Sequence, residues 1–386
     1  MKGFCRSIQA KIQSRLAENE PLIQVVIGPR QVGKTTAIRQ AAPNAYYQTA
    51  DSPTPYMPDV IEQWWKEALL TPQKVLVIDE VQKIEGWAEV IKKLWDSHGS
   101  TLKVILSGSA ALSIEKNLKE SLAGRYELIR AQHWNWNEAS LGMGLSLEQY
   151  IEFGCYPGAV RYLSEISRWS DYVKDSIVEP VIGRDILQLH PVENPALLRQ
   201  VFGFCVSIPA QVISLNKLQG QLNDRGAIAT LQHYLNLLEK AFLVTGVQKY
   251  SPSPLRTRAS SPKIVLRDNG LLRAFERPLL TNLSPERKGR YFENLVISRF
   301  IEAGWQVYYW NDRNLDVDLV VEGPQGENWA IEVKTTANFS QKDLSGLKTF
   351  CQRNKHFQPK LVVLEPVQKK LHDVECLEVD QILSLG

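Results

Sequence analysis

The residues best suited to chemistry form a short glycine-rich segment near the N-terminus. It fits the phosphate-loop pattern G-x-x-x-x-G-K-[ST], and its residues are Gly28, Pro29, Arg30, Gln31, Val32, Gly33, Lys34, Thr35 and Thr36. The glycines allow backbone N–H groups to point at a polyphosphate, and the helix expected after the loop adds its positive N-terminal dipole. We therefore expect this segment to bind ATP, with Lys34 at the β- and γ-phosphates and the Thr35 hydroxyl on Mg²⁺.

Two acidic residues supply the second half of such a site. The apolar run 75–78 predicts a buried parallel strand, and Asp79 and Glu80 follow it directly. Asp79 would hold Mg²⁺ through water, while Glu80 would orient or deprotonate the water that attacks the γ-phosphate. A further predicted strand, with the apolar run 104–106, leads to Ser107, which could sense the γ-phosphate or simply mark the exit of a strand. The sequence thus predicts an ATPase on an open parallel α/β sheet, with its ligand beyond the carboxyl ends of the strands.

A sheet and flanking helices must position these residues. The patterns predict further strands over 22–27 and 45–51, and helices over 6–18, 35–41, 60–70 and 87–97. Arg125 follows the Ser107 strand, in the segment Ser-Leu-Ala-Gly-Arg-Tyr at 121–126. It could neutralise charge on the γ-phosphate, in its own chain or in a neighbouring copy of a homo-oligomer, or it could be a solvated surface arginine. Spacing alone leaves both interpretations open.

Composition narrows the class of protein. A chain of 386 residues predicts two or three domains, and a net charge of +3 neither requires nor excludes nucleic acid as a partner. The five cysteines are widely spaced and form no C-x-x-C pair, which favours reduced thiols in a cytosol over disulfides or a zinc site. No stretch approaches the roughly 20 apolar residues of a membrane span, so we expect a cytoplasmic protein with no membrane partner.

The order of these motifs resembles that of a known family. After the phosphate loop come Val-Ile-Asp-Glu-Val-Gln at 77–82, Ser-Gly-Ser at 107–109, Leu-Ala-Gly-Arg at 122–125 and His-Trp-Asn-Trp-Asn-Glu at 133–138. This order is similar to that of the AAA-type ATP-binding proteins of bacteria and archaea whose C-terminal half is a domain of unknown function. Further segments that resemble the family's are Gly-Cys-Tyr-Pro-Gly at 154–158, with Cys155 in place of a glycine, Gly-Arg-Asp-Ile at 183–186 and Asp-Asn-Gly-Leu at 268–271. The resemblance implies ATP binding and hydrolysis, a helical lid, a winged-helix middle and a C-terminal nuclease-like fold.

The middle of the chain predicts mainly helices. Residues 147–190 have helical patterns that suit a lid over the nucleotide. Three short helices are expected over 196–207, 214–223 and 227–240, with Ser214 as the N-cap of the second. Strands over 242–248 and 263–266 would complete a winged helix, whose third helix enters the major groove when the fold binds DNA.

The surface of this predicted winged helix does not look like that of a DNA reader. Its third helix would expose Gln232, His233, Asn236 and Glu239, which supply little positive charge, so a protein contact or a structural role is favoured. From 249 to 290 the sequence has ten lysines and arginines against three acids. That basic stretch could follow a phosphate backbone or could be a solvated linker.

The C-terminal part carries a second candidate site. It predicts a helix over 290–303, strands over 305–310, 315–321 and 329–334, a helix over 341–351 and a strand over 360–364. This αβββαβ order resembles the core of the restriction-endonuclease-like, or PD-(D/E)xK, nucleases. The matching residues are Glu293 on the first helix, Asp318 in the second strand, and Glu332 and Lys334 in the third, although Val317 stands where the name-giving motif has proline. The period of two in a strand places Glu332 and Lys334 on one face.

Such a cluster is suited to phosphodiester cleavage. Asp318 and Glu332, together with Glu293, would bind one or two Mg²⁺ ions at the scissile phosphate of DNA or RNA, and Lys334 would help to activate the water. Two hypotheses follow: an ATPase that controls a C-terminal nuclease, or an ATP-driven switch whose C-terminal domain is catalytically silent and binds nucleic acid or a protein partner. The predicted domains are an AAA-type P-loop ATPase domain over 1–145, a helical lid over 146–195, a winged-helix-like domain with the basic linker over 196–284, and a nuclease-like α/β domain over 285–386.

Overall fold

The computed structural model describes residues 4–109, 111–188, 191–222, 227–253, 257, 260–279, 282–366 and 373–386. The chain forms two compact units, which we call the N-terminal unit (Met1–Gln132 and Gly183–Pro191) and the C-terminal unit (His133–Ile182 and Val192–Gly386). None of the helices in the described ranges combines the length and the apolar character that a membrane span requires.

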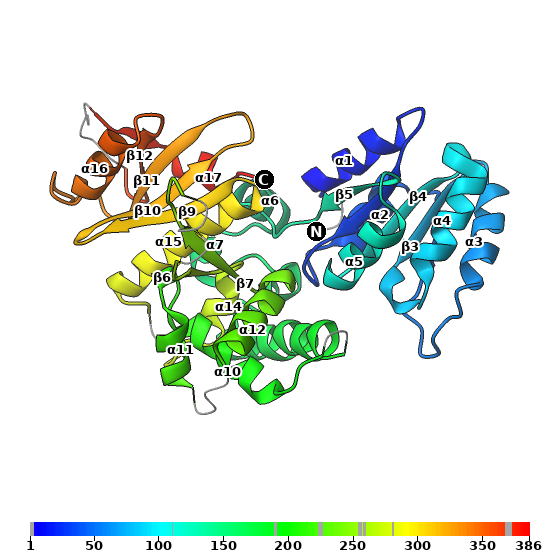
Figure 1. Ribbon diagram of the computed structural model, residues 1–386, viewed down its shortest axis with the longest axis horizontal. Coiled ribbons are helices and arrows are strands. Elements are labelled where there is room, and N and C mark those ends of the chain that lie inside the picture. The colour runs from blue at the N-terminus through cyan, green and yellow to red at the C-terminus, as the bar shows by residue number, and fades with distance from the viewer. Residues whose placement is uncertain are drawn as a thin grey trace. The chain divides into compact units, whose positions relative to one another are not determined.

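The N-terminal unit is built on a five-stranded sheet (Figure 1). Its strands are β1 (Ile23–Ile27), β2 (Tyr46–Thr49), β3 (Val75–Asp79), β4 (Lys103–Gly108) and β5 (Tyr126–Arg130), in the order β2-β3-β4-β1-β5. Each neighbouring pair is parallel. β1 and β3 are buried along their whole length, as expected for a parallel sheet with helices on both faces. The open parallel α/β fold predicted for this part of the chain is confirmed.

The helices of the N-terminal unit pack in pairs. They are α1 (Ser7–Leu16), α2 (Lys34–Ala41), α3 (Val60–Leu69), α4 (Trp87–His98) and α5 (Ala111–Ser121). α1 packs against α2, α3 against α4, and α4 against α5. The first four are the helices that the sequence predicts, with ends shifted by no more than two residues.

The strand order places the end of β4 between the ends of β1 and β3. Ser107 of β4 is opposite Val26 of β1 on one side and opposite Asp79 of β3 on the other. The phosphate loop begins with Gly28, directly after β1. The loop, Asp79 and Ser107 therefore lie together at the carboxyl edge of the sheet, where ligands of open α/β sheets bind.

Most helices of the C-terminal unit come before its main strands. They are α6 (Trp136–Met143), α7 (Leu147–Phe153), α8 (Pro157–Val160), α9 (Ile166–Asp171), α10 (Pro195–Ser207), α11 (Leu215–Gln221), α12 (Ile228–Lys240), α14 (Asn269–Arg273), α15 (Pro285–Glu302), α16 (Ser345–Arg353) and α17 (Val379–Leu383). Ser214 caps α11 as predicted, since its side chain accepts a hydrogen bond from the Lys217 N–H. Two π-helical segments, Tyr172–Val178 and Val181–Ile186, follow α9, and the second continues into the N-terminal unit.

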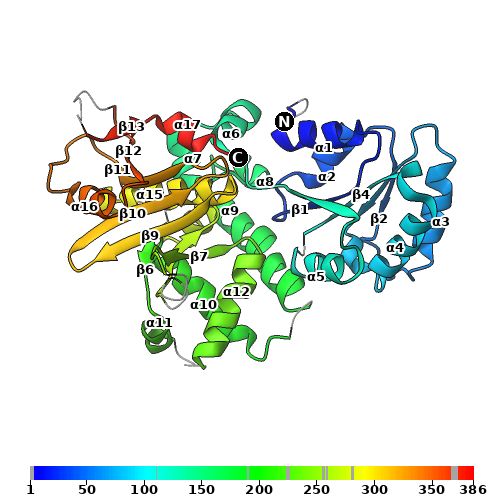
Figure 2. The same ribbon diagram turned by 45° about the horizontal axis from the view of Figure 1, so that its top comes forward.

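A sheet of eight strands runs through the C-terminal unit (Figure 2). Its strands are β6 (Gln211–Val212), β7 (Val244–Lys249), β8 (Lys263–Leu266), β9 (Gln306–Asp312), β10 (Leu315–Glu322), β11 (Asn328–Lys334), β12 (Gln358–Val363) and β13 (Glu375–Leu377), in the order β13-β12-β11-β10-β9-β7-β8-β6. β9, β10 and β11 form an antiparallel meander, and β12 joins β11 in parallel. β7 pairs in parallel with β9, so the strands predicted for a wing extend the C-terminal sheet. The sequence did not predict this pairing.

Aromatic side chains fill the core beside this pairing. Tyr250, which follows β7, makes edge-to-face contacts with Tyr308, Phe350 and Phe357, with ring centroids 5.7, 5.4 and 5.1 Å away. α16 packs on β10, β11 and β12. Outside the described residues lie the predicted helix end at Asn223, positions 189–190 of the predicted lid, and positions 254–256, 258–259 and 280–281 of the basic stretch.

Candidate functional site

The phosphate loop owes its shape to two glycines. Gly33 has a φ of 91°, a left-handed conformation that strains any residue with a side chain, and it stands directly before α2. A Cβ atom at Gly28 would lie 2.0 Å from the carbonyl oxygen of Ala131, so the loop can approach β5 only with glycine there. Gln31 and Thr36 are exposed, whereas Pro29 and Val32 are buried. A glycine-rich turn leading into a helix N-terminus is the arrangement that binds polyphosphates.

Lys34 is folded onto its own loop. Its ammonium group donates hydrogen bonds to the carbonyl oxygens of Gly28, over 2.9 Å, and Pro29, over 2.7 Å. Burial lowers the pKa of Lys34 to about 8, although the carboxylates of Glu80 and Asp79 act in the opposite direction. A buried ammonium gains a favourable counter-charge when a phosphate arrives. The role of Lys34 at the β- and γ-phosphates stays a prediction.

Asp79 is the centre of a hydrogen-bond cluster at the end of β3. Its Oδ2 accepts from Thr35 Oγ1 over 2.8 Å and from the Tyr47 hydroxyl, and its Oδ1 accepts from Ser107 Oγ over 2.6 Å. The Asp79 side chain is buried. Mg²⁺ prefers oxygen ligands and usually takes only one or two from the protein, with the rest from water and phosphate. Thr35 and Asp79 therefore fit the predicted magnesium site. Tyr47 belongs to the same hydrogen-bond cluster, and the sequence did not reveal it.

Glu80 leaves β3 with an unusual backbone. Its φ of 54° lies in the left-handed region, which non-glycine residues rarely adopt and which is concentrated at functional sites. Gln82 Nε2 donates to Glu80 Oε2 over 2.6 Å, and Ser109 Oγ lies 3.4 Å from the same oxygen. Gln82 Oε1 is buried and has no hydrogen-bond partner among the described residues. The role of Glu80 in orienting a water stays a prediction.

An ion pair that the sequence did not reveal lies at the same edge. Arg30 of the phosphate loop donates from Nε and from a terminal nitrogen to both carboxylate oxygens of Asp185, over 2.6 and 2.5 Å. Asp185 belongs to the second π-helical segment, and its Oδ1 also lies 3.4 Å from Ser109 Oγ. The sole sequence signal was its place in the Gly-Arg-Asp-Ile segment, which carried no functional assignment.

Arg125 lies at the opposite edge of the sheet. Its carbonyl oxygen accepts a hydrogen bond from the N–H of Ile23, at the start of β1, whereas the phosphate loop follows the end of β1. Its guanidinium group pairs with Asp96 of α4, over 2.6 and 3.1 Å. The structure does not bring Arg125 to the phosphate loop of its own chain, and a role in a neighbouring copy stays a proposal.

In the C-terminal unit, Glu293 and Asp318 meet a lysine that was not among the predicted site residues. Lys263 of β8 donates to Glu293 Oε1 over 2.7 Å and to the carbonyl oxygen of Asp318 over 2.9 Å. Arg290 lies 3.3 Å from the other oxygen of Glu293. Burial raises the pKa of Glu293, although Lys263 opposes this, while the pKa of Lys263 is raised by the neighbouring carboxylates against the effect of its own burial. Lys263 and Glu293 form a buried ion pair.

Glu332 and Lys334 pair on one face of β11, as the strand period predicts. Lys334 Nζ donates to Glu332 Oε1 over 2.6 Å, whereas Oε2 is buried and lacks a hydrogen-bond partner within the described part of the chain. Burial, reinforced by the charge of Asp318, raises the pKa of Glu332 to about 9. Asp318 Oδ2 accepts from the N–H of Val333 over 2.9 Å. The four predicted residues of this site therefore lie in one region of the C-terminal unit.

These acids do not present a ready metal site. In the ranges that the structure describes, no group of three or more His, Cys, Asp or Glu side chains is placed to hold a metal ion. One oxygen of Glu293 is bound by the ammonium group of Lys263, and one oxygen of Glu332 by that of Lys334. Asp318 and Glu332, the predicted metal ligands, are not part of such a group among the described residues, and their role at a metal ion stays a prediction.

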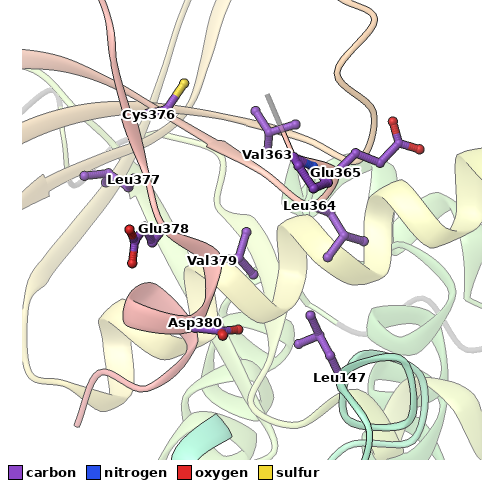
Figure 3. A pocket seen from close by; sticks show the side chains of 10 residues that line it. Leu147, Val363, Leu364, Glu365, Cys376, Leu377, Glu378, Val379 and Asp380 are labelled. Carbon is purple, nitrogen blue, oxygen red and sulfur yellow. The ribbon is translucent and has the colours of Figure 1, made fainter. Parts of the chain in front are cut away.

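Two cavities of the C-terminal unit differ in their chemistry. One of about 270 Å³ is lined by members of the charged cluster, among them Lys263, Arg290, Glu293, Asp316 and Asp318. The other, of about 410 Å³, lies where β12 and β13 end and is lined by Glu365, Cys376, Glu378 and Asp380 with several apolar residues (Figure 3). Burial raises the pKa of the Cys376 thiol, so it is a weak nucleophile. The smaller cavity is thus the one that adjoins predicted site residues.

Three family models match successive parts of the chain. Residues 20–140 match a family described as an AAA domain. Residues 144–286 match the domain of unknown function DUF8612, and residues 288–382 match the domain of unknown function DUF4143. The AAA match contains the phosphate loop, Asp79 and Ser107.

Similar proteins are found in bacteria and archaea. An uncharacterized protein of Mycobacterium tuberculosis is 26% identical over 335 residues, which are 85% of this chain and 74% of that protein. An uncharacterized protein of Methanocaldococcus jannaschii is 22% identical over 351 residues, 83% of this chain and 76% of that protein.

Two solved structures are similar over part of the chain. The match to a Walker-type ATPase of Pyrococcus abyssi covers 70% of this chain and 95% of that one, with 14% identity and a TM-score of 0.46. The match to the RuvB Holliday junction branch migration motor of Thermotoga maritima covers 62% and 88%, with 17% identity and a TM-score of 0.33. Together, the AAA family match and the geometry of the phosphate loop identify residues 20–140 as an AAA-type ATP-binding domain.

Proposed function

We propose that the protein hydrolyses ATP with Mg²⁺ at the carboxyl edge of the five-stranded sheet. The observation that carries this proposal is the Asp79 cluster, in which a buried carboxylate is held between Thr35 of the phosphate loop and Ser107 of the neighbouring strand. The backbone of the loop and Lys34 would bind the β- and γ-phosphates. Mg²⁺, when bound beside Thr35 and Asp79, would neutralise charge on these phosphates.

Hydrolysis also needs a positioned water. Glu80 follows Asp79 directly and is held by Gln82, so its carboxylate would orient the attacking water and accept its proton. Ser107 would donate a hydrogen bond to the γ-phosphate once its bond to Asp79 rearranges. Phosphoryl transfer requires mainly positioning and charge stabilisation, and this group of residues offers both.

ATP turnover by the full chain with Mg²⁺ tests this proposal. Lys34→Ala and Asp79→Asn should each reduce turnover by roughly a hundredfold or more, because each removes charge stabilisation at the reacting phosphates. Lys66→Ala, at an exposed position of α3, is the matched control and should turn over ATP normally. Unchanged hydrolysis in Lys34→Ala would contradict the assignment of the nucleotide site.

For the C-terminal unit we propose that ATP drives a switch whose charged cluster binds nucleic acid or a protein partner without cleaving it. The pairing of Glu293 with Lys263 and of Glu332 with Lys334 supports this proposal, because an ammonium group already occupies one oxygen of each acid that a metal ion would otherwise bind. A nuclease under the control of ATP is the alternative. The unpartnered Oε2 of Glu332 supports it, since a buried orphan oxygen is suited to an incoming cation.

Cleavage assays distinguish these two alternatives. The full chain would be incubated with Mg²⁺ or Mn²⁺ and with single-stranded DNA, duplex DNA or RNA, in the presence and absence of ATP. The double variant Glu332→Ala, Lys334→Ala is the matched control. We expect no cleavage by either protein alongside normal ATP turnover, whereas cleavage by the unmutated protein alone would establish the nuclease.

A role of Arg125 in a neighbouring copy is a separate proposal. Its exposed pair with Asp96 leaves the guanidinium at the surface, where a second copy could receive it. Analytical ultracentrifugation with ATP, together with Arg125→Ala, tests it. Turnover that rises with protein concentration and is lost in the variant would support the proposal, and turnover that is independent of concentration would exclude it.

A further inference from the structure

Arg30 and Asp185 form a two-point ion pair at the carboxyl edge of the N-terminal sheet. Both oxygens of Asp185 accept from the guanidinium group, over 2.6 and 2.5 Å. The Asp185 side chain is 7% exposed and that of Arg30 is 23% exposed, so the pair is only partly screened by water. A two-point Arg–carboxylate contact of this kind fixes the orientation of both groups.

The pair lies among the charges that would surround the terminal phosphate of ATP. Asp185, Glu80 and Asp79 all act on the buried ammonium group of Lys34. Ser109 Oγ lies 3.4 Å from Glu80 and 3.4 Å from Asp185, so it stands between the predicted water-orienting carboxylate and the ion pair. The bound γ-phosphate would bring further negative charge into a region that already holds three carboxylates.

In this arrangement the γ-phosphate and the carboxylate of Asp185 compete for the guanidinium group of Arg30. Arginine binds phosphate with the same two-point geometry as carboxylate, and Arg30 belongs to the loop that encloses the polyphosphate. The γ-phosphate attracts the guanidinium group of Arg30 and repels the carboxylate of Asp185. We propose that Arg30 exchanges Asp185 for the γ-phosphate when ATP binds, so that the pair senses whether the third phosphate is present.

The place of Asp185 in the chain gives this exchange a consequence. Residues 183–191 belong to the N-terminal unit, but the chain on both sides of them belongs to the C-terminal unit. The segment around Asp185 is π-helical, a rare conformation that is frequent at functional sites. Release of Asp185 would therefore free a segment that is covalently continuous with the C-terminal unit. ATP, and not ADP, would produce this release.

Nucleotide affinities test the exchange, which rests on the proposed ATP site. Fluorescent ATP and ADP analogues would be titrated into the full chain with Mg²⁺. Asp185→Asn removes the competing charge but keeps the shape of the side chain. It should therefore raise the affinity for ATP about fivefold and leave the affinity for ADP nearly unchanged. Arg30→Ala should abolish the preference for ATP over ADP. The double variant Arg30→Ala, Asp185→Asn should bind ATP no more tightly than Arg30→Ala does. The reason is that the guanidinium group that Asp185→Asn would free is absent.

Trypsin cleavage provides a second readout. Arg184 is exposed and adjacent to Asp185, so the rate of cleavage after Arg184 reports on the attachment of this segment. A non-hydrolysable ATP analogue should accelerate cleavage severalfold more than ADP does. Arg30→Ala, which breaks the pair without changing the cleaved bond, should be cleaved fast without nucleotide. The proposed exchange would be refuted if every variant changed its affinities for ATP and ADP equally, or if the rate of cleavage did not depend on the nucleotide. Absence of any nucleotide binding by the unmutated protein would instead refute the ATP site itself.

Discussion

Replacing Lys34 by methionine should abolish ATP binding and at the same time stabilise the nucleotide-free protein. Burial lowers the pKa of Lys34 from 10.5 to about 8. The folded protein therefore loses roughly 3 kcal/mol of stability at pH 7 by keeping this group charged. Methionine has a similar length and no charge. It cannot make the hydrogen bonds to the carbonyl oxygens of Gly28 and Pro29, and their loss offsets about 1 kcal/mol of the stability gained by removing the charge. We expect a net gain of roughly 2 kcal/mol in the free energy of unfolding.

The pH dependence separates this effect from better packing. Between about pH 8 and pH 10.5 the unfolded chain holds the Lys34 proton and the folded protein has released it, so the stability of the unmutated protein rises with pH there. The advantage of Lys34→Met should therefore shrink by about 1 kcal/mol between pH 7 and pH 9. Urea unfolding at both pH values measures it, and the control Lys66→Met should change stability by less than about 0.5 kcal/mol. A methionine variant that is less stable at pH 7, or whose advantage does not depend on pH, would refute the reasoning.

Three further outcomes are expected. Glu80→Gln should bind fluorescent ATP with an affinity within about threefold of that of the unmutated protein, because the phosphate contacts remain. It should release phosphate roughly a hundredfold more slowly, because the proton acceptor is lost. Equal turnover by the two proteins would exclude Glu80 as the base. Gly28→Ala should lower the free energy of unfolding by about 1–3 kcal/mol and weaken ATP binding, since its Cβ atom would lie 2.0 Å from the Ala131 carbonyl oxygen. Gly203→Ala on α10 is the control, because a Cβ atom there meets nothing within 4 Å. It should stabilise the protein by about 0.5–1 kcal/mol in thermal unfolding. Glu332 keeps its proton when folded up to about pH 9, so between pH 6 and pH 8 the unmutated protein should lose roughly 2–3 kcal/mol of stability relative to Glu332→Gln in urea unfolding. Parallel pH profiles of the two proteins would show that Glu332 is ionised.

The carboxyl edge of the first sheet could be predicted because its residues end or follow apolar runs. The phosphate loop, Asp79 and Ser107 each come directly after or at the end of such a run, and parallel strands bring those ends to one edge. Asp185 could not be predicted, because it is 155 residues from Arg30 and local spacing does not reveal which loop a helical segment meets.

The same limit applies to the second site. The αβββαβ order and the Glu332–Lys334 pair follow from local periodicity, and the structure contains both. The contact of Lys263 with Glu293 depends instead on the place of β8 in the larger sheet, which no local pattern specifies. Spacing likewise left the position of Arg125 open, and the strand register puts it beside the start of β1.

The parallel pairing of β7 with β9 determines how the chain can be divided. A fragment that begins at residue 285 would lack β7 and leave the N–H and C=O groups of β9 exposed along that edge. It would also lack Tyr250 and so open the aromatic cluster around Phe350 and Phe357. Such a fragment should aggregate or recruit a strand from another chain. Recombination between relatives would meet the same obstacle, so the strands from β6 to β13 are expected to be inherited and exchanged as a single piece.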